Sequence, residues 1–179
     1  MKITRKVIAS LLTMAMAGIN APLALASSEP VSVTISGKII ANTCTLDSTS
    51  VIVPLGSIAL RELQTTGKTS SLKSFHLDLK ECGDAAKSVN VTVKGIADEQ
   101  NSQALALTSA GDSAAQGVAI YLLDKDKNII PVNDAALATY NLVTGNKNTL
   151  LFYAQYVATT DNPRAGEAKS SASIYLDYQ

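Results

Sequence analysis

Residues 31–39 read VSVTISGKI, an alternation of apolar and polar side chains with the period of a β-strand. The apolar row consists of Val31, Val33, Ile35, Gly37 and Ile39. No neighbouring segment of the sequence offers this strand a hairpin partner. A strand of this kind, at the start of a mature chain, is well placed to complete the sheet of another molecule.

The first 26 residues have the composition of a secretory signal peptide. Three basic residues precede an uncharged run over 7–19, and the triplet ALA at 24–26 satisfies the small-x-small rule for signal peptidase. The uncharged run has 13 residues, whereas a membrane-spanning helix needs about 20. We therefore expect an exported, soluble protein with a signal peptide over 1–26, an N-terminal extension over 27–39 and one domain over 40–179.

Cleavage after Ala26 leaves 153 of the 179 residues, a length suited to one domain with a substantial core. Three of the 15 basic residues lie in the signal segment and all 15 acidic residues lie outside it, so the mature chain carries a net charge of −3. This balance gives no reason to expect nucleic acid or an anionic membrane surface as a partner.

The chain has two cysteines, Cys44 and Cys82, and both belong to the expected mature protein. An even number of cysteines in an exported chain favours a structural disulfide. A disulfide between them would close a loop of about 38 residues. In the chain-entropy estimate, such a loop stabilises the folded state by about 4 kcal/mol relative to the unfolded state. The rival interpretation, a metal site, is disfavoured because two thiols and the single histidine cannot complete a tetrahedral zinc shell without carboxylates.

Period-two alternation recurs along the chain, whereas capped helical stripes are hard to find. The pattern predicts an all-β protein with about six core strands besides the N-terminal one, spaced as in an immunoglobulin-like sandwich, which normally has seven. A long polar loop is expected over 98–116 and a second loop over 159–166. The expected core strands cover 39–46, 75–79, 89–93, 118–122, 150–156 and 172–178, with shorter extended stretches at Val51 and Val53 and in a return over 129–132.

Two groups of polar residues resemble known chemical sites, and neither is convincing. His76 and Asp78 share the polar face of one strand, but no nucleophile motif accompanies them. Asp124, Asp126 and Asn128 resemble the start of a calcium loop, yet Ile129 stands where the sharp turn needs glycine. The sequence therefore favours an exposed strand face at His76 and a charged hairpin turn at Asp124.

The N-terminal strand has two ordinary interpretations, a floppy tail or an edge strand of its own sandwich. A solvated tail would not need β-branched residues at alternate positions over 30–35. The core has about six expected strands, one fewer than the seven of an immunoglobulin-like sandwich, and this argues against an ordinary edge strand of the same molecule. The last expected strand places Ala172, Ile174, Leu176 and Tyr178 on one face.

Taken together, these residues resemble the subunits of chaperone–usher pili, and type 1 fimbrial pilins in particular. The resemblance covers essentially the whole chain. It is carried by the segment 33–37 leading to Cys44, by Cys82 at the end of a strand, and by the stretch 152–156. The most specific part is the C-terminal pattern of Gly166, the alternating Ala172, Ile174 and Leu176, and the penultimate Tyr178.

This resemblance implies an incomplete immunoglobulin-like sandwich that lacks its seventh strand. A periplasmic chaperone would hold the open subunit by lending a strand, and at an outer-membrane usher the N-terminal extension of the next subunit would replace it. The donor row would be Val31, Val33, Ile35, Gly37 and Ile39. The strand bordering the receiving groove, which the chaperone would also recognise, would carry Gly166, Ala172, Ile174, Leu176 and Tyr178.

The leading hypothesis is therefore a structural pilus subunit without catalysis, cofactor, metal or small-molecule substrate. Its partners would be copies of itself or related pilins, the chaperone and the usher, and it would end in a fimbria on the cell surface. The extension before Gly37 is short, which fits a minor or linking subunit as well as a rod subunit. The alternative is a self-contained exported carbohydrate-binding β-sandwich, and an exported hydrolase is a more distant third.

Overall fold

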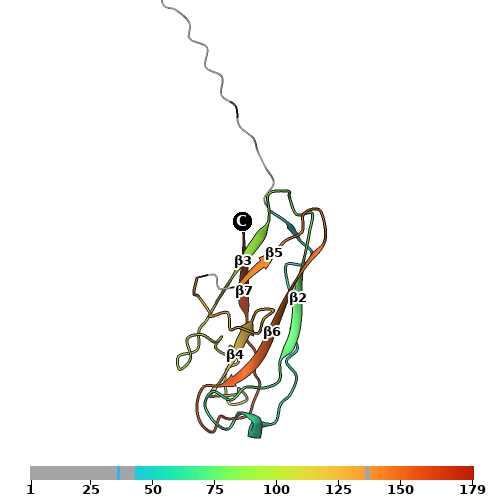
Figure 1. Ribbon diagram of the computed structural model, residues 1–179. Helices are drawn as coiled ribbons and strands as arrows, with labels where there is room; N and C mark the ends of the chain where they lie inside the picture. Colours follow the sequence, from blue (N-terminus) through green and yellow to red (C-terminus); the bar gives the residue numbers. More distant parts are fainter. Residues whose placement is uncertain (1–35, 37–42, 136–137) are drawn as a thin grey trace, which may run out of the picture. The chain divides into compact units, whose positions relative to one another are not determined.

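The computed structural model describes Ser36 and residues 43–135 and 138–179 (Figure 1). The expected signal peptide and donor row lie outside these residues. Five of the strands pack their apolar alternate residues inward, as the sequence predicts. The elements are β1 (Thr45–Leu46), the 3-10 turn η1 (Leu60–Leu63), β2 (Lys73–Lys80), β3 (Ser88–Gly95), β4 (Val118–Leu123), β5 (Ala138–Asn141), β6 (Asn148–Ala158) and β7 (Ala172–Tyr178).

The strands form two antiparallel sheets, one with the order β1-β2-β6-β4 and the other with the order β5-β3-β7. The expected all-β sandwich is therefore confirmed. β7 pairs with β3 along its whole length, from Gly95 opposite Ala172 to Val89 opposite Tyr178. Among the described residues no strand pairs with the other side of β7. The strand that is missing from the sandwich is the one that would lie there.

The core lies between the inner faces of the two sheets. Phe152 of β6 is 1% exposed, and its ring stacks on that of Phe75 with centroids 5.4 Å apart. On the facing sheet, Val89, Val91 and Val93 of β3 are completely buried. Burial of each such side chain contributes about 1.5–3 kcal/mol, so these central strands hold the domain together.

The structure corrects the expected strands in two places. Ile129–Val132 does not form a strand, because Ile129 and Val132 make only isolated bridges, to Leu123 and Val93 respectively. The strand in this part of the chain is β5, which the sequence did not predict. Val51 and Val53 also lie outside any strand.

The expected turn at Asp124 is confirmed as a hairpin turn. The Asp124 Oδ1 atom accepts hydrogen bonds from the backbone N–H groups of Asp126 and Asn128, both at 2.8 Å. The Asp124 carboxylate therefore accepts hydrogen bonds from the backbone of its own turn. No cluster of three or more potential metal-binding side chains occurs in the described ranges. No helix in the described part of the chain has the length and apolar character to cross a bilayer.

Candidate functional site: an open groove beside β7

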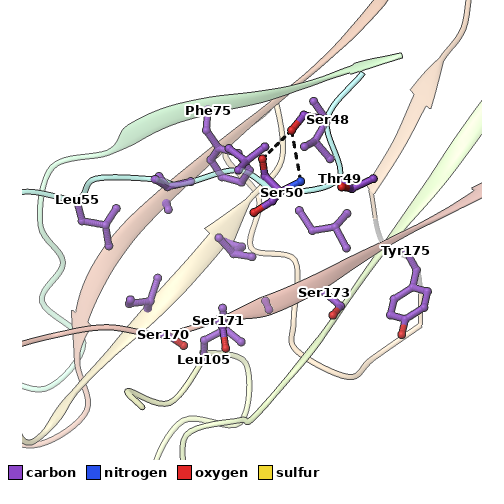
Figure 2. Close-up of a pocket in the computed structure, with 18 of the residues that line it drawn as sticks. Ser48, Thr49, Ser50, Leu55, Phe75, Leu105, Ser170, Ser171, Ser173 and Tyr175 are labelled. Carbon is purple, nitrogen blue, oxygen red and sulfur yellow. Dashed lines mark hydrogen bonds between the residues drawn. The ribbon is translucent and has the colours of Figure 1, made fainter. Parts of the chain in front are cut away.

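A groove of about 640 Å³ runs between β7 and the segment that follows β1 (Figure 2). Its floor consists of core side chains that include Phe75 of β2, Leu122 of β4 and Leu105 of the connection between β3 and β4. One wall is residues 170–175 and the other is residues 46–55, although not every residue of the second segment contributes. The groove thus opens the interior of the sandwich along the unpaired side of β7.

The inner face of β7 is only half covered. Ile174, Leu176 and Tyr178 point toward the core but remain partly exposed, and Ala172 is exposed. On β3, Val89, Val91 and Val93 lie opposite the first three of these residues and are completely buried. Apolar side chains on the inner face of a sandwich are normally shielded from both sides. β7 therefore lacks a neighbour that would cover its inner row.

The backbone of β7 shows the same vacancy. Gln179 and Ser88 exchange hydrogen bonds, N–H to O=C, at 2.9 and 3.3 Å. Since hydrogen-bonding direction alternates along an antiparallel strand, the odd-numbered residues of β7 face β3. The N–H and C=O groups of the even-numbered residues therefore face the unpaired side of β7, and they belong to Ala172, Ile174, Leu176 and Tyr178, the same four that form the apolar row.

The opposite wall was missed by sequence reasoning as a part of the site. Val53 and Leu55 are half-buried and line the groove, whereas Ile52, just before Val53, is 91% exposed and does not line it. This alternation, with Val51 also on the groove side, was visible in the sequence. From the sequence, this alternation indicated an ordinary strand of the sandwich. In the described structure the segment pairs with no strand and instead forms a wall of the groove.

Leu105 limits the space in the groove near Ala172, since both residues line it. Gly95 lies directly opposite Ala172 in the β3·β7 pairing, and a Cβ atom on Gly95 would approach Leu105 Cδ2 to 2.6 Å. Leu105 thus occupies the space above Gly95. A strand added beside β7 would meet Leu105 at the same level and would need a small residue there.

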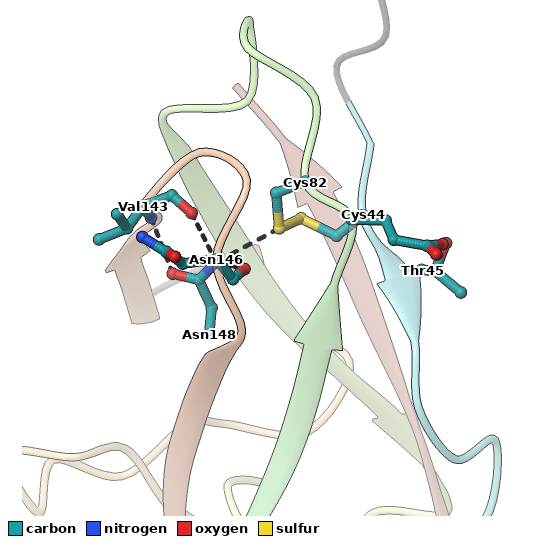
Figure 3. Close-up of a disulfide and its surroundings, with 7 residues drawn as sticks. Cys44, Thr45, Cys82, Val143, Asn146 and Asn148 are labelled. Carbon is teal, nitrogen blue, oxygen red and sulfur yellow. Dashed lines mark hydrogen bonds between the residues drawn. A yellow bond between two sulfur atoms is a disulfide. The ribbon is translucent and has the colours of Figure 1, made fainter.

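Cys44 and Cys82 form a disulfide at one end of the sandwich (Figure 3). The buried Asn148 side chain donates hydrogen bonds from Nδ2 to Cys82 Sγ at 3.4 Å and to the Val143 carbonyl at 3.0 Å. Asn148 Oδ1 accepts from the Val143 N–H at 2.7 Å. The disulfide therefore anchors the start of β1 next to the turn over 143–147.

Tyr178 lies at the same end of the sandwich as the disulfide. Partial burial raises the pKa of its phenol, while a hydrogen bond with the Cys44 backbone opposes that effect. The last inward side chain of β7 is thus fixed beside the disulfide.

Gly166 does not lie on β7 or in the groove. It packs against the backbone at 113–115, where a Cβ atom would approach the Ser113 carbonyl oxygen to 2.4 Å. The neighbouring Glu167 N–H donates to the same oxygen at 2.7 Å. Gly166 therefore allows two backbone segments to touch just before β7 begins.

We expect Gly166→Ala to lower the free energy of unfolding, because the added methyl group must displace backbone rather than a flexible side chain. Overpacking of this kind costs about 1–3 kcal/mol. Guanidinium unfolding followed by circular dichroism measures the change, with Ala165→Ser at the exposed neighbouring position as the control. Equal unfolding midpoints for Gly166→Ala and the unchanged protein would contradict this assignment.

The His76 and Asp78 pair has a structural explanation. Asp78 forms an ion pair with Lys147 at 2.8 Å, and its Oδ1 accepts a hydrogen bond from Thr149 Oγ1 at 2.7 Å. Hydrogen bonds from Lys147 and Thr149 lower the pKa of the Asp78 carboxyl group. His76 Nε2 is 3.8 Å from the other Asp78 oxygen on an exposed sheet face. The arrangement is a surface charge network across β2 and β6.

Comparison with known proteins places this groove in context. A family model described as fimbrial protein matches residues 33–179. The uncharacterized fimbrial-like protein YcbV of Escherichia coli K12 is 38% identical over 148 residues, which cover 82% of this chain and 84% of that protein. The S-fimbrial protein subunit SfaG of Escherichia coli O6:K15:H31 is 36% identical over 149 residues, 82% of each chain.

Solved structures agree with the fold. A Burkholderia pseudomallei antigen and type I fimbria protein superimposes with a TM-score of 0.59 and 29% identity, over 75% of this chain and 88% of that chain. The P pilus rod subunit PapA superimposes with a TM-score of 0.61 over 76% of this chain and 99% of that chain. At 19% identity, the second likeness concerns the fold alone.

Proposed function

This chain belongs to the fimbrial protein family and is a structural subunit of a chaperone–usher pilus, and we propose that it assembles by donor-strand exchange. Residues 31–39 of one subunit fill the groove of the next. The observation that carries the proposal is the row of Ala172, Ile174, Leu176 and Tyr178, which leaves apolar side chains incompletely covered and backbone unpaired along one side of β7, where Ala172 and Ile174 line the groove.

The donor strand runs antiparallel to β7. The existing pairs in the β5-β3-β7 sheet are all antiparallel, and antiparallel pairing is slightly more stable per residue than parallel pairing. With Gly37 beside Ala172, the narrow point under Leu105 receives the one donor position without a side chain. The other donor positions then follow in order, with Ile39 beside Ser170, Ile35 beside Ile174, Val33 beside Leu176 and Val31 beside Tyr178.

The open groove also leads us to infer the steps that precede assembly. The subunit passes through the periplasm, where a chaperone lends the strand that covers the groove, and an outer-membrane usher directs the exchange for the donor of the next subunit. The subunit itself has a mechanical role and no catalytic one. Its assembly partners are copies of itself or related pilins, in a fimbria at the cell surface.

Electrophoresis in a denaturing gel without boiling tests this function. Strand exchange predicts a ladder of multimers that collapses to one band on boiling, because release of the donor would expose the open core and is therefore slow. A single band before boiling would support the self-contained carbohydrate-binding sandwich instead.

A Gly37→Val variant is expected to form weaker polymers. The added side chain would collide with Leu105 at the narrow point, at a cost of about 1–3 kcal/mol for an overpacked site. The temperature at which unboiled multimers dissociate in detergent should fall. Ser36→Val, which places the same side chain on the predicted solvent-facing side, should leave that temperature unchanged, and an equal effect of the two variants would refute the register.

A further inference from the structure

The groove has a continuation that the donor row does not fill. A second pocket of about 490 Å³ lies between residues 56–63 and 164–169. These segments directly extend the two walls of the groove, 46–55 and 170–175. Its apolar lining includes Ile58, Leu60, Leu63, Val118, Tyr156 and Ala168.

The position of the second pocket relates it to the donor strand. β7 runs from Ala172 to Tyr178, and Tyr178 lies at the disulfide end. The second pocket is at the other end of β7, where Leu60 and Leu63 of η1 line it. Figure 1 shows η1 at the end of the domain far from the C-terminus. An antiparallel donor strand therefore leaves the groove, at Ile39, next to this pocket.

Only four residues, 40–43, separate Ile39 from Cys44, where the donating subunit's domain begins. Five Cα-to-Cα steps span at most about 18 Å when fully extended. The disulfide end of the donating domain must consequently lie close to the second pocket of the receiving domain.

That end carries an exposed apolar side chain. Val143 is 58% exposed, and its backbone is held to the disulfide through Asn148 (Figure 3). The same turn is tied to Cys82 by a hydrogen bond from the Gly145 N–H to the Cys82 carbonyl at 3.3 Å. Val143 is thus a rigidly mounted apolar group at the end that the short connection brings to the pocket.

We propose that the second pocket is a docking site for another copy of this chain, and that it receives the turn over 143–147 of the subunit whose donor strand fills the adjacent groove. This inference rests on the proposed function and adds a body-to-body contact to the strand exchange. The contact is heterologous, one end of a subunit against the opposite end of the next, and so it propagates along a fibre. It would limit bending at the connection between subunits.

Cross-linking of assembled fibres tests the contact. Fibres of the double variant Leu60→Cys/Val143→Cys are treated with a short bis-maleimide, then boiled and separated in a denaturing gel. Because boiling removes the non-covalent donor strand, only covalent links preserve multimers. Neighbouring thiols in a contact are held at a high effective concentration, so we expect multimer bands about tenfold stronger than in either single variant.

A matched control moves the second cysteine from position 143 to position 96. Ile96 is 66% exposed and follows the end of β3 that lies away from the disulfide. Leu60→Cys/Ile96→Cys should give no more boiled multimers than the single variants. Unboiled samples of every variant are run in parallel, because their ladders report strand exchange independently of cross-linking.

The outcomes separate the two claims. A normal unboiled ladder with no cross-linked multimers, or with equal cross-linking in the Ile96 control, would overturn the docking site and leave strand exchange standing. Cross-linking of Leu60→Cys to Ile39→Cys, with none to Val143→Cys, would show that the donor strand and not the turn occupies the pocket, and would also overturn the docking site. Absence of the unboiled ladder from otherwise unchanged protein would remove both.

Discussion

Ile35→Asp should abolish polymerisation while leaving the domain folded. The substitution places a carboxylate in the middle of the proposed donor row, where it would be buried against Ile174 without a partner. An uncompensated buried charge costs about 3–5 kcal/mol, in addition to the lost apolar contacts of isoleucine. Unboiled samples should therefore show no ladder, whereas the receiving groove of the same subunit is unaltered and should still accept an unchanged donor.

Ser36→Asp provides the matched control, since it introduces the same charge one residue later. Adjacent residues of a strand face opposite sides, so this carboxylate would point to solvent and the ladder should persist. A normal ladder from Ile35→Asp, or equal loss in both variants, would contradict the assignment of the buried row.

Removal of the disulfide is the second change with a large expected effect. Cys44 and Cys82 are 38 residues apart, and the chain-entropy estimate for such a loop is about 4 kcal/mol. The loss should be especially damaging here because the bridge anchors β1, a two-residue strand that pairs only with β2.

The effect can be measured in a self-complemented chain, in which residues 27–39 are moved behind Gln179 through a short linker. We expect this chain to be a stable monomer that does not polymerise. Cys44→Ala/Cys82→Ala in this chain should lower the free energy of unfolding by about 4 kcal/mol in urea. A loss below 1 kcal/mol in the double variant would contradict the anchoring role.

The central strands could be predicted from the sequence because their two faces have different environments. β2, β3 and β7 alternate apolar and polar residues for this reason, and the structure places the apolar sides inward. β5 escaped prediction because its four residues, with the inward Ala138 and Tyr140, give too short a pattern. Its strand geometry comes from pairing with β3, and the apolar residues at 129–132 drew the expectation to the wrong segment.

The candidate site was predictable on one side only. The row on β7 follows from alternation along a single strand, whereas the opposite wall is extended chain without a described ladder partner. Leu105 came from a stretch expected to be a polar surface loop, yet it is 3% exposed and reaches the inner face at Gly95. Contacts between residues so distant in sequence leave no local periodicity. Gly166 was expected near the groove, but its requirement arises from backbone contact with 113–115.

Hydrogen–deuterium exchange at β7 in the self-complemented chain tests the central claim most directly. The account predicts that the amides of Ile174, Leu176 and Tyr178, which face the side of β7 away from β3, exchange as slowly as those of the buried strand β3. The same amides should become fast-exchanging when Ile35→Asp is introduced. Rapid exchange of these three amides in the chain carrying the unchanged donor segment, with β3 still protected, would show that residues 31–39 do not complete the sheet.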